Sequence, residues 1–218
     1  MAERRDGPYV WLTWLAQWMS GQNTCEWSVW FRANWQDYER VEDETDWASY
    51  RARHTKLLRE THRALNDEGY RVKRENQNRF AYRHEASTDV VVGGKPDLVA
   101  LGEHDNIVLD TKTGRAHDWH EFQVLIPMAL LPQSNLVEHH ERRFRGRLVY
   151  EDGVVRNFDQ RQADDILEQL PYFLDILGGS EEGAMRVPSW QECRYCPISK
   201  THCPDRIESD PSGEWEED

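Results

Sequence analysis

The segment Gly94-Lys-Pro-Asp-Leu-Val-Ala100, together with Val108-Leu-Asp-Thr-Lys-Thr-Gly114 that follows it, decides how this chain folds. Both segments contain apolar runs of strand length, but charged residues interrupt them: Asp97 in the first, Asp110 and Lys112 in the second. Because side chains alternate between the two faces of a strand, Asp110 and Lys112 share a face. The pattern predicts two strands that carry a polar site.

The four residues between these strands, Gly-Glu-His-Asp at 102–105, predict a hairpin turn. A hairpin centred on this turn pairs Leu101 with Asn106 and places Asp97 opposite Asp110, with Cβ atoms about 5 Å apart. Two such carboxylates repel unless a cation lies between them, and oxygen ligands suit Mg²⁺ or Mn²⁺. Lys112 would then orient or activate a water beside the metal. The alternative is an edge hairpin with solvated charges.

The rest of the chain predicts helices before this hairpin, a mainly antiparallel sheet around it, and a helix and a cysteine-rich end after it. Asp46 predicts the N-cap of a long helix that Gly69 ends. Seven of the ten Trp lie in the first 47 residues, where core packing explains them better than stacking on bases. The expected helices are 9–20, 25–36, 46–68, 117–131 and 160–177; the expected strands are 70–75, 79–83, 88–92, 96–101 and 106–112, with a hairpin at 146–157.

This order predicts an α/β (α+β) fold with three layers, a mixed and largely antiparallel sheet flanked by helices. We expect one domain over residues 1–206, in which 22–45 and 186–206 form a cysteine-cluster subregion. An acidic, disordered tail is expected over 207–218.

Charge and hydropathy narrow the functional classes. The net charge is −13, but residues 37–46 contribute −5 and residues 205–218 contribute −6, so the remaining body is nearly neutral and can bind nucleic acid. No stretch approaches the roughly 18 apolar residues of a membrane helix. The N-terminus has no signal-peptide pattern, and we expect a cytoplasmic protein.

The two strands resemble the PD-(D/E)XK nuclease superfamily, in its RecB-like branch that includes iron–sulfur CRISPR-associated exonucleases and stand-alone relatives. Gly94-Lys-Pro-Asp97 is similar to the G-x-P-D motif, and Asp110-Thr-Lys112-Thr-Gly114 to the (D/E)-x-K-T-G motif. The resemblance covers about residues 22–206. It implies a restriction-endonuclease-like core, Mg²⁺ or Mn²⁺, and cleavage of DNA, single-stranded or at duplex ends, with CRISPR-adaptation or repair proteins as partners.

The resemblance also assigns residues outside the hairpin. It implies that His54, on the helix with Arg53-His-Thr-Lys, is a further metal ligand, with His62 as the fallback. The carbonyl of Thr111 joins Asp97 and Asp110 as a ligand. Gln123 matches the family's Gln-x-x-x-Tyr motif, but Pro127 stands where the tyrosine is expected, and a helix kink is expected there.

The four cysteines form one further pattern. Cys25 stands alone, whereas Cys193, Cys196 and Cys203 are grouped near the end. In an apparently cytosolic chain this distribution favours a Cys₄ site over two disulfides, holding either an iron–sulfur cluster or Zn²⁺. The resemblance implies a [4Fe–4S] cluster, because those nucleases also have one cysteine before the core and three after it.

Two basic runs are candidates for phosphate contacts. The denser contains Arg142, Arg143, Arg145 and Arg147, and the other alternates Arg or Lys with amides and aromatics from Arg71 to Arg83. A solvated loop and a strand face are the alternatives. No base-reading motif occurs, so sequence-specific recognition is not expected.

Three functions are therefore open: a metal-dependent DNA exonuclease with a structural iron–sulfur cluster, a catalytically weak nuclease-fold iron–sulfur scaffold that positions DNA for a partner complex, and a zinc-binding interaction protein.

Overall fold

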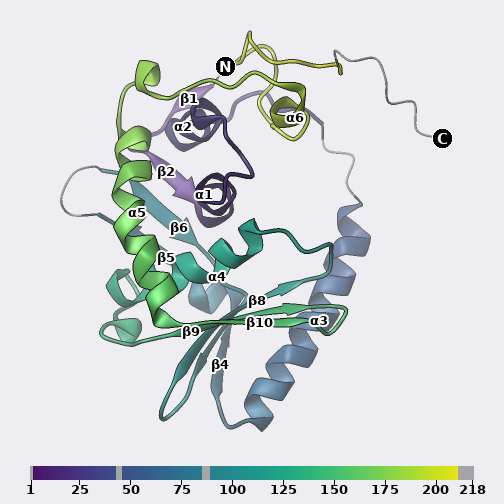
Figure 1. The fold of residues 1–218 in the computed structure, drawn as a ribbon, viewed down its shortest axis with the longest axis vertical. Coiled ribbons are helices and arrows are strands. Elements are labelled where there is room, and N and C mark those ends of the chain that lie inside the picture. Colours follow the sequence, from purple (N-terminus) through teal and green to yellow (C-terminus); the bar gives the residue numbers. More distant parts are fainter. Residues whose placement is uncertain (1, 43–45, 85–88, 211–218) are drawn as a thin grey trace.

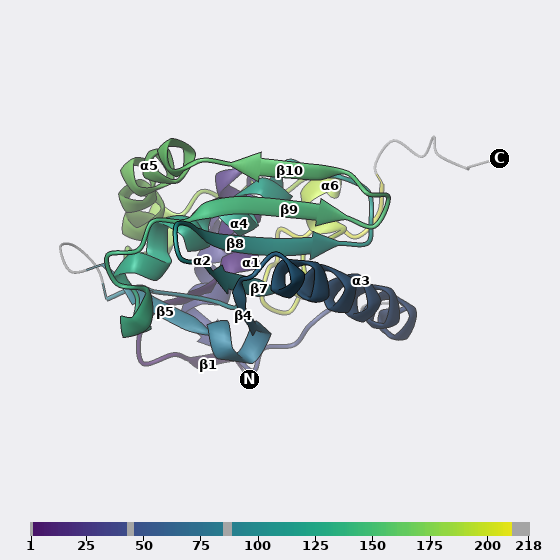
Figure 2. The ribbon, with the colours of Figure 1, turned by 90° about the horizontal axis from the view of Figure 1, so that it is seen from below.

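A computed structural model describes residues 2–42, 46–84 and 89–210. Its main sheet has five strands, in the order β10 (Val155–Phe158), β9 (Arg145–Tyr150), β8 (Asn106–Lys112), β7 (Leu98–Leu101) and β4 (Arg71–Arg74) (Figure 2). All neighbours are antiparallel except β8 and β9, which are parallel and are joined through helix α4 (Trp119–Leu130). The predicted mixed, largely antiparallel sheet is confirmed.

The β7–β8 hairpin has the register expected from its sequence. Leu101 pairs with Asn106, and Leu98 pairs with Leu109. The Gly102 N–H closes the turn on the Asp105 carbonyl at 3.0 Å. One step beyond the ladder, the same register places Asp97 beside Asp110.

Helices cover both faces of this sheet (Figure 1). On one face, α3 (Trp47–Asp67) packs Leu58 and Leu65 against alternate residues of the hairpin, which are Leu98, Ala100, Ile107 and Leu109. On the other face, Val99 and Val108 belong to the larger core with α4 and α5 (Gln160–Gly178). The fold therefore has the three layers that the sequence predicted.

The ends of α3 lie where its capping residues predict. The Asp46 carboxylate accepts hydrogen bonds from the N–H groups of Ala48 and Ser49, at 3.2 and 3.1 Å. Gly69 follows the helix with a φ of +93°, a conformation that glycine adopts without strain. This helix carries His54 to the edge of the hairpin.

The N-terminal region differs from the prediction. The residues Tyr9–Trp11 form β2, which pairs parallel to β6 (Val91–Gly94), so the first helix, α1 (Leu12–Met19), begins later than expected. β5 (Phe80–Arg83) joins β6 in this second sheet, and β1 (Glu3–Arg4) pairs with β3 (Trp35–Gln36). Three sheets therefore stand where one was expected: the 80–94 segment pairs with Tyr9–Trp11 in the second, and β1 pairs with β3 in the third.

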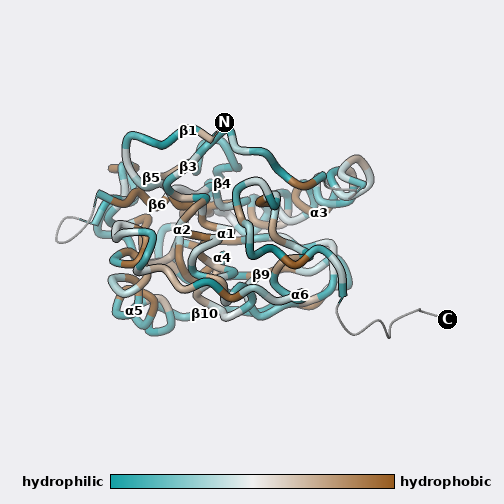
Figure 3. Tube along the Cα trace, turned by 90° about the horizontal axis from the view of Figure 1, so that it is seen from above, coloured by the Kyte–Doolittle hydropathy of each residue, from teal (hydrophilic) through white to brown (hydrophobic). Residues whose placement is uncertain are grey.

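The tryptophan-rich segments build the core rather than a surface. Trp18 on α1 and Trp27 and Trp30 on α2 (Glu26–Asn34) are buried against α5 and its neighbours. Hydrophobic residues gather where α1, α2 and α4 meet (Figure 3). The expectation of core packing is confirmed for these three residues.

Short elements complete the chain. The C-terminal part contains only the short α6 (Trp190–Cys193), and 3₁₀ turns occur at Glu75–Asn78, Leu131–Gln133, Val137–His139 and Glu181–Gly183. None of the helices in the described ranges is long and apolar enough to cross a membrane. Residues 43–45 of the acidic run and 211–218 of the expected tail lie outside the described residues.

Candidate active site

Asp97 is the most heavily bonded carboxylate of the hairpin. Its Oδ2 accepts hydrogen bonds from the Thr111 N–H at 2.8 Å and from the Thr111 hydroxyl at 2.6 Å. His54 Nε2, reaching from α3, lies 3.1 Å from the same oxygen. Burial would raise the pKa of Asp97, but the His54 and Thr111 bonds outweigh it and lower that pKa. Asp97 is therefore held as an anion, with His54 beside it.

Asp110 has the opposite environment. It is 7 % exposed, and its pKa rises to about 6 because burial disfavours the anion and Asp97 repels it, while Lys112 opposes both effects. The Lys112 ammonium lies 2.6 Å from Oδ2, yet this oxygen accepts no hydrogen bond of acceptable geometry among the described residues. One buried carboxylate oxygen is thus available to another ligand.

Lys112 is fixed from three sides. Its Nζ pairs with Asp110, donates a hydrogen bond to Gln123 Oε1 from α4, and lies 5.4 Å from the Trp119 ring centroid. Burial alone would lower the pKa of Lys112, but Asp110 raises it, so the ammonium stays charged. Gln123 in turn donates to Thr13 Oγ1 at 3.2 Å.

The structure therefore brings together Asp97, Asp110, Thr111 and Lys112 with His54 and Gln123, as the sequence predicted. Three further residues join the site. Tyr50 stacks on His54, Trp119 lies next to Lys112, and Thr13 accepts a hydrogen bond from Gln123. The spacing of Tyr50 and His54, one helical turn apart, could have suggested the first of these. Nothing local points to Thr13, which lies 110 positions from its partner.

A divalent cation fits this site on the chemistry of its donors. Two carboxylates meet at the strand ends, and one has a buried oxygen without a hydrogen bond among the described residues. Burial, together with the neighbouring Asp97, raises the pKa of Asp110, so a cation there would favour the anionic form. As the side chains stand, no three His, Cys, Asp or Glu residues within 2–42, 46–84 and 89–210 form a ready metal-binding group.

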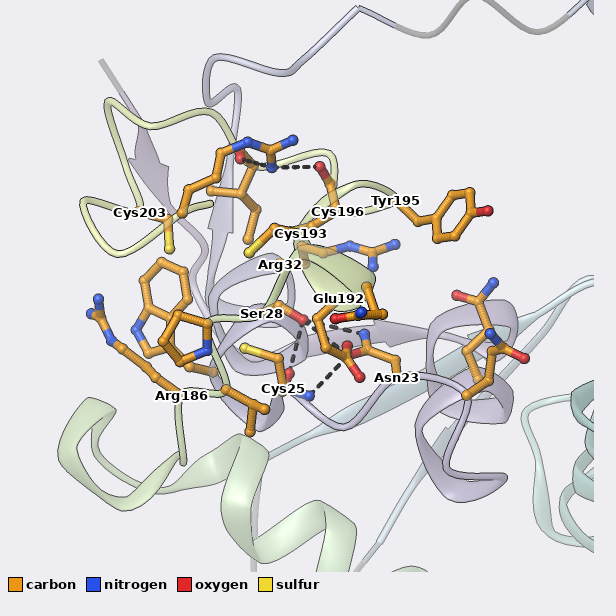
Figure 4. A pocket seen from close by; sticks show the side chains of 18 of the residues that line it. Asn23, Cys25, Ser28, Arg32, Arg186, Glu192, Cys193, Tyr195, Cys196 and Cys203 are labelled. Carbon is orange, nitrogen blue, oxygen red and sulfur yellow. Dashed lines mark hydrogen bonds between the residues drawn. The ribbon is translucent and has the colours of Figure 1, made fainter. Parts of the chain in front are cut away.

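The four cysteines line one cavity of about 360 Å³ between α2 and the C-terminal segment (Figure 4). All four are free thiols. Burial raises the pKa of Cys203, and the charges of Cys196, Cys193 and Cys25 raise it further. The four thiols are therefore close enough to interact electrostatically. Cys25 thus lines the same cavity as the 193–203 segment, but within the described residues the four thiols are not gathered into a group that could hold a metal as they stand, so the cysteine cluster stays a prediction.

Arginines surround this cavity. Arg186 stacks over Trp27 at 4.0 Å, and Arg206 donates to the carbonyls of Cys196 and Ile198, both at 2.8 Å. Arg32 is buried, which lowers its pKa to about 10, and the charge of Cys196 acts in the opposite direction. Burial raises the pKa of Cys196 and of Cys203, and the charges of Arg32 and Arg206 at Cys196 and of Arg186 at Cys203 offset part of the rise.

His62, the fallback ligand, lies away from the hairpin end, and its ring bonds the Asn66 side chain at 3.1 Å.

The 142–147 run, expected to contact phosphates, is partly strand, and three of its arginines have a partner in the protein. Arg142 donates to Asn106 at 3.2 Å, Arg145 lies 3.7 Å from Asp105, and Arg147 lies 3.7 Å from Glu68. The carbonyl of Arg143 accepts a hydrogen bond from Asn106 at 3.1 Å. The side chain of Arg145 is still 73 % exposed, and phosphate contacts by this run stay a prediction.

Pro127 is buried within α4, and the helix continues through it to Leu130. The Leu131 N–H bonds the Pro127 carbonyl, so the turn after the proline is intact. No tyrosine occupies this position, and Gln123 makes its contacts without one.

Comparison with known proteins identifies a family. A crystal structure described as that of SSO0001 matches with a TM-score of 0.49 and 12% identity, over 94% of this chain and 90% of the other. No curated protein matches the chain. The family model of the PD-(D/E)XK nuclease superfamily matches residues 14–204, which contain the hairpin, the helix bearing His54 and all four cysteines. The chain therefore belongs to the PD-(D/E)XK nuclease superfamily, whose members are in general metal-dependent phosphodiester hydrolases.

Proposed function

We propose that this chain is a metal-dependent deoxyribonuclease whose catalytic residues are Asp97, Asp110, Lys112 and Gln123. The observation that carries the proposal is the buried, unsatisfied Oδ2 of Asp110, next to Asp97 and 2.6 Å from a fixed ammonium group. A hairpin with only a structural role would gain little from two neighbouring buried carboxylates, because the desolvation of a buried charge costs stability even where an ammonium pairs with it.

The metal ligands in this proposal are Asp97, Asp110, His54 and the carbonyl of Thr111. A bound Mg²⁺ or Mn²⁺ would supply Lewis acidity toward the phosphate and lower the pKa of a coordinated water. In the structure, the His54 ring also orients Asp97, since Nε2 lies 3.1 Å from both Asp97 Oδ2 and Thr111 Oγ1.

Lys112 and Gln123 would act on the substrate side. The ammonium offsets charge on the phosphate oxygens and orients the attacking water. Gln123 holds the ammonium, and Thr13 holds Gln123, so a chain of contacts from α1 through α4 fixes the position of the Lys112 nitrogen. This preorganisation supports a catalytic rather than a surface role.

We further propose that Cys25, Cys193, Cys196 and Cys203 hold a [4Fe–4S] cluster, as in the RecB-like branch that the sequence resembles. The shared cavity and the surrounding arginines support a site for thiolate ligands, and Zn²⁺ is the other metal that such a Cys₄ site could take. The cluster would be structural, since the cavity lies beyond Trp119 from the hairpin carboxylates.

The same resemblance favours exonucleolytic attack on DNA ends, with CRISPR-adaptation or repair proteins as partners. End-labelled linear DNA and closed circular DNA, each incubated with Mn²⁺, test this mode. Release of nucleotides from linear DNA alone supports it, and nicking of the circle contradicts it.

The test of the nuclease itself is the change Asp110→Asn. We expect cleavage with Mg²⁺ or Mn²⁺ to be lost while the folded structure, followed by circular dichroism, is retained, because the amide has the same shape but binds metal poorly. The melting temperature should fall, because the buried Lys112 ammonium loses its anionic partner. Asp175→Asn, an exposed carboxylate on α5, is the matched control and should cleave normally. Wild-type cleavage by Asp110→Asn would disprove the assignment.

Pro127 supports one second candidate, a nuclease-fold scaffold with weak catalysis that positions DNA for a partner complex. It stands where the resemblance expects a tyrosine, and it is buried in α4. A wild-type protein that binds metal and DNA but cleaves neither linear nor circular DNA would favour this candidate.

A further inference from the structure

The exposed side of α3 carries a basic surface that forms no ion pair with the part of the chain that the structure describes. We use "α3 basic surface" for Arg51, Lys56, Arg59 and Arg63 on α3 together with Arg74 at the end of β4, all of which are exposed. None of the five forms an ion pair with a described carboxylate. The only acids lining its grooves are Glu60 and Glu75.

Several basic residues elsewhere have partners within the protein. The arginines of the 142–147 run contact Asn106, Asp105 and Glu68, and Lys73 pairs with Glu138. On α3, by contrast, Arg59 and Arg63 lie one turn apart, and the repulsion between like charges at this spacing destabilises a helix. A phosphate bound beside both side chains would offset this repulsion.

The surface is continuous with a polar groove. Two shallow grooves, each under 600 Å³, share Thr55 and Arg59 in their walls. The first lies on α3, and the second lies between α3 and the 3₁₀ turn Glu75–Asn78. The second groove adds the amides of Asn76 and Gln77 to the guanidinium of Arg74. Amide and hydroxyl donors next to guanidinium groups are the usual contacts to phosphate and sugar.

The groove adjoins the candidate active site through the backbone. The Glu75 N–H bonds the Asp97 carbonyl at 2.9 Å, and α3 itself carries His54 to Asp97. A polymer with one phosphate at the hairpin carboxylates could therefore extend along α3. Figure 1 shows α3 on one flank of the molecule, opposite α5.

Among the described residues, no aromatic side chain lines either groove. Binding of single strands commonly uses aromatic rings on which bases stack, whereas contacts to the phosphate backbone of a duplex need only cationic and hydrogen-bonding side chains. The distance from Arg51 to Arg63 along the helix is about 18 Å, which matches the rise of about five base pairs.

We propose that the α3 basic surface binds the phosphate backbone of double-stranded DNA next to the cleavage site. This inference rests on the proposed function, since it names the substrate form that this active site takes. It does not depend on cleavage, because the contacts are electrostatic.

The test measures binding without cleavage. The full-length protein, with Ca²⁺ in place of Mg²⁺, is titrated with a fluorescent duplex of about 25 base pairs at several salt concentrations. Removing the charges of Arg59 and Arg63 together, by Arg59→Gln and Arg63→Gln, should weaken binding and lower the slope of log Kd against log salt by about 1.8, since each duplex phosphate contact contributes about 0.9. Arg161→Gln, an exposed arginine on α5, is the matched control and should leave the slope unchanged.

Restoring the charge separates electrostatics from folding. Arg59→Lys with Arg63→Lys should regain most of the wild-type slope. The inference is overturned if the glutamine double variant keeps the wild-type slope, or if Arg161→Gln loses as much slope as the double variant. The duplex assignment is overturned if the double variant loses as much affinity for a single strand of the same length as for the duplex. A wild type that binds as expected but never cleaves would leave this inference standing while refuting the proposed nuclease.

Discussion

At the residue scale, Lys112 is the side chain whose role is most sharply defined by its surroundings. It is 12 % exposed at the side chain, paired with Asp110, and held by Gln123 and Trp119. A buried ammonium of this kind is costly unless the charge is used or fully paired. Its position explains why the Asp-x-Lys spacing matters: the two residues share a strand face and meet at the sheet end.

We expect Lys112→Ala to cleave DNA about 10²–10⁴-fold more slowly while metal and DNA binding are retained, because the ammonium orients water and offsets phosphate charge rather than holding the ion. Single-turnover cleavage with Mn²⁺ measures the rate, and Lys200→Ala, an exposed lysine, is the control. Equal rates for Lys112→Ala and wild type would remove Lys112 from the mechanism.

At the element scale, α4 both positions a side chain of the candidate active site and packs against the main sheet. Its Gln123 faces Lys112, while His120 one turn earlier packs against the parallel strands and lies 3.2 Å from the Tyr150 hydroxyl of β9. Burial lowers the pKa of His120 to about 3, and the charges of Lys112, His117 and Arg156 add to the shift. The imidazole is therefore neutral in the folded protein at any ordinary pH.

This makes the packing of α4 on the sheet sensitive to acid. In the unfolded chain His120 takes up a proton below pH about 6.5, while in the folded chain it does so only near pH 3, so stability is lost as pH falls between these values. At pH 5 the loss amounts to about 2 kcal/mol. Urea unfolding at pH 7.5 and pH 5 measures the free energy of unfolding at each pH. Between these pH values, His120→Gln should lose about 2 kcal/mol less of this free energy than wild type does. His104→Gln, in the exposed β7–β8 turn, should lose as much as wild type, and equal losses in all three proteins would contradict the prediction.

At the scale of the whole molecule, the cysteine cavity joins the two ends of the domain. Cys25 precedes α2, and the other three cysteines follow α5 by more than ten residues, so a bound cluster closes a loop of about 170 residues. Closing such a loop stabilises the fold by about 4–5 kcal/mol, by restricting the unfolded chain.

Protein purified without oxygen should therefore contain about four irons per chain, and removing them should lower the melting temperature by about 10–20 °C. Cys196→Ser should lose the colour of the cluster and show a similar drop. Iron analysis and thermal unfolding test both statements. One zinc and no iron, in protein made with ample iron, would overturn the iron–sulfur assignment.

The local sequence was enough to predict several parts of this molecule. Alternating apolar residues and the 102–105 turn predicted the register that brings Asp97 to Asp110, because both signals act over a few residues. Asp46 and Gly69 predicted both ends of α3, since a helix cap is satisfied by its nearest neighbours. The sequence also placed Lys112 on the strand face of Asp110 for the same reason, because the alternation of side chains along a strand is a local property.

Only the tertiary structure decided the rest. The pairing of Tyr9–Trp11 with 91–93, and the contact of Gln123 with Thr13, join residues far apart in the chain, and no local pattern encodes their partners. The same holds for charge: Arg145 and Arg147 meet acids from other elements, whereas Arg59 and Arg63 meet none among the described residues. A sequence shows which residues are charged, but whether a charge is free for a ligand depends on what the fold packs beside it.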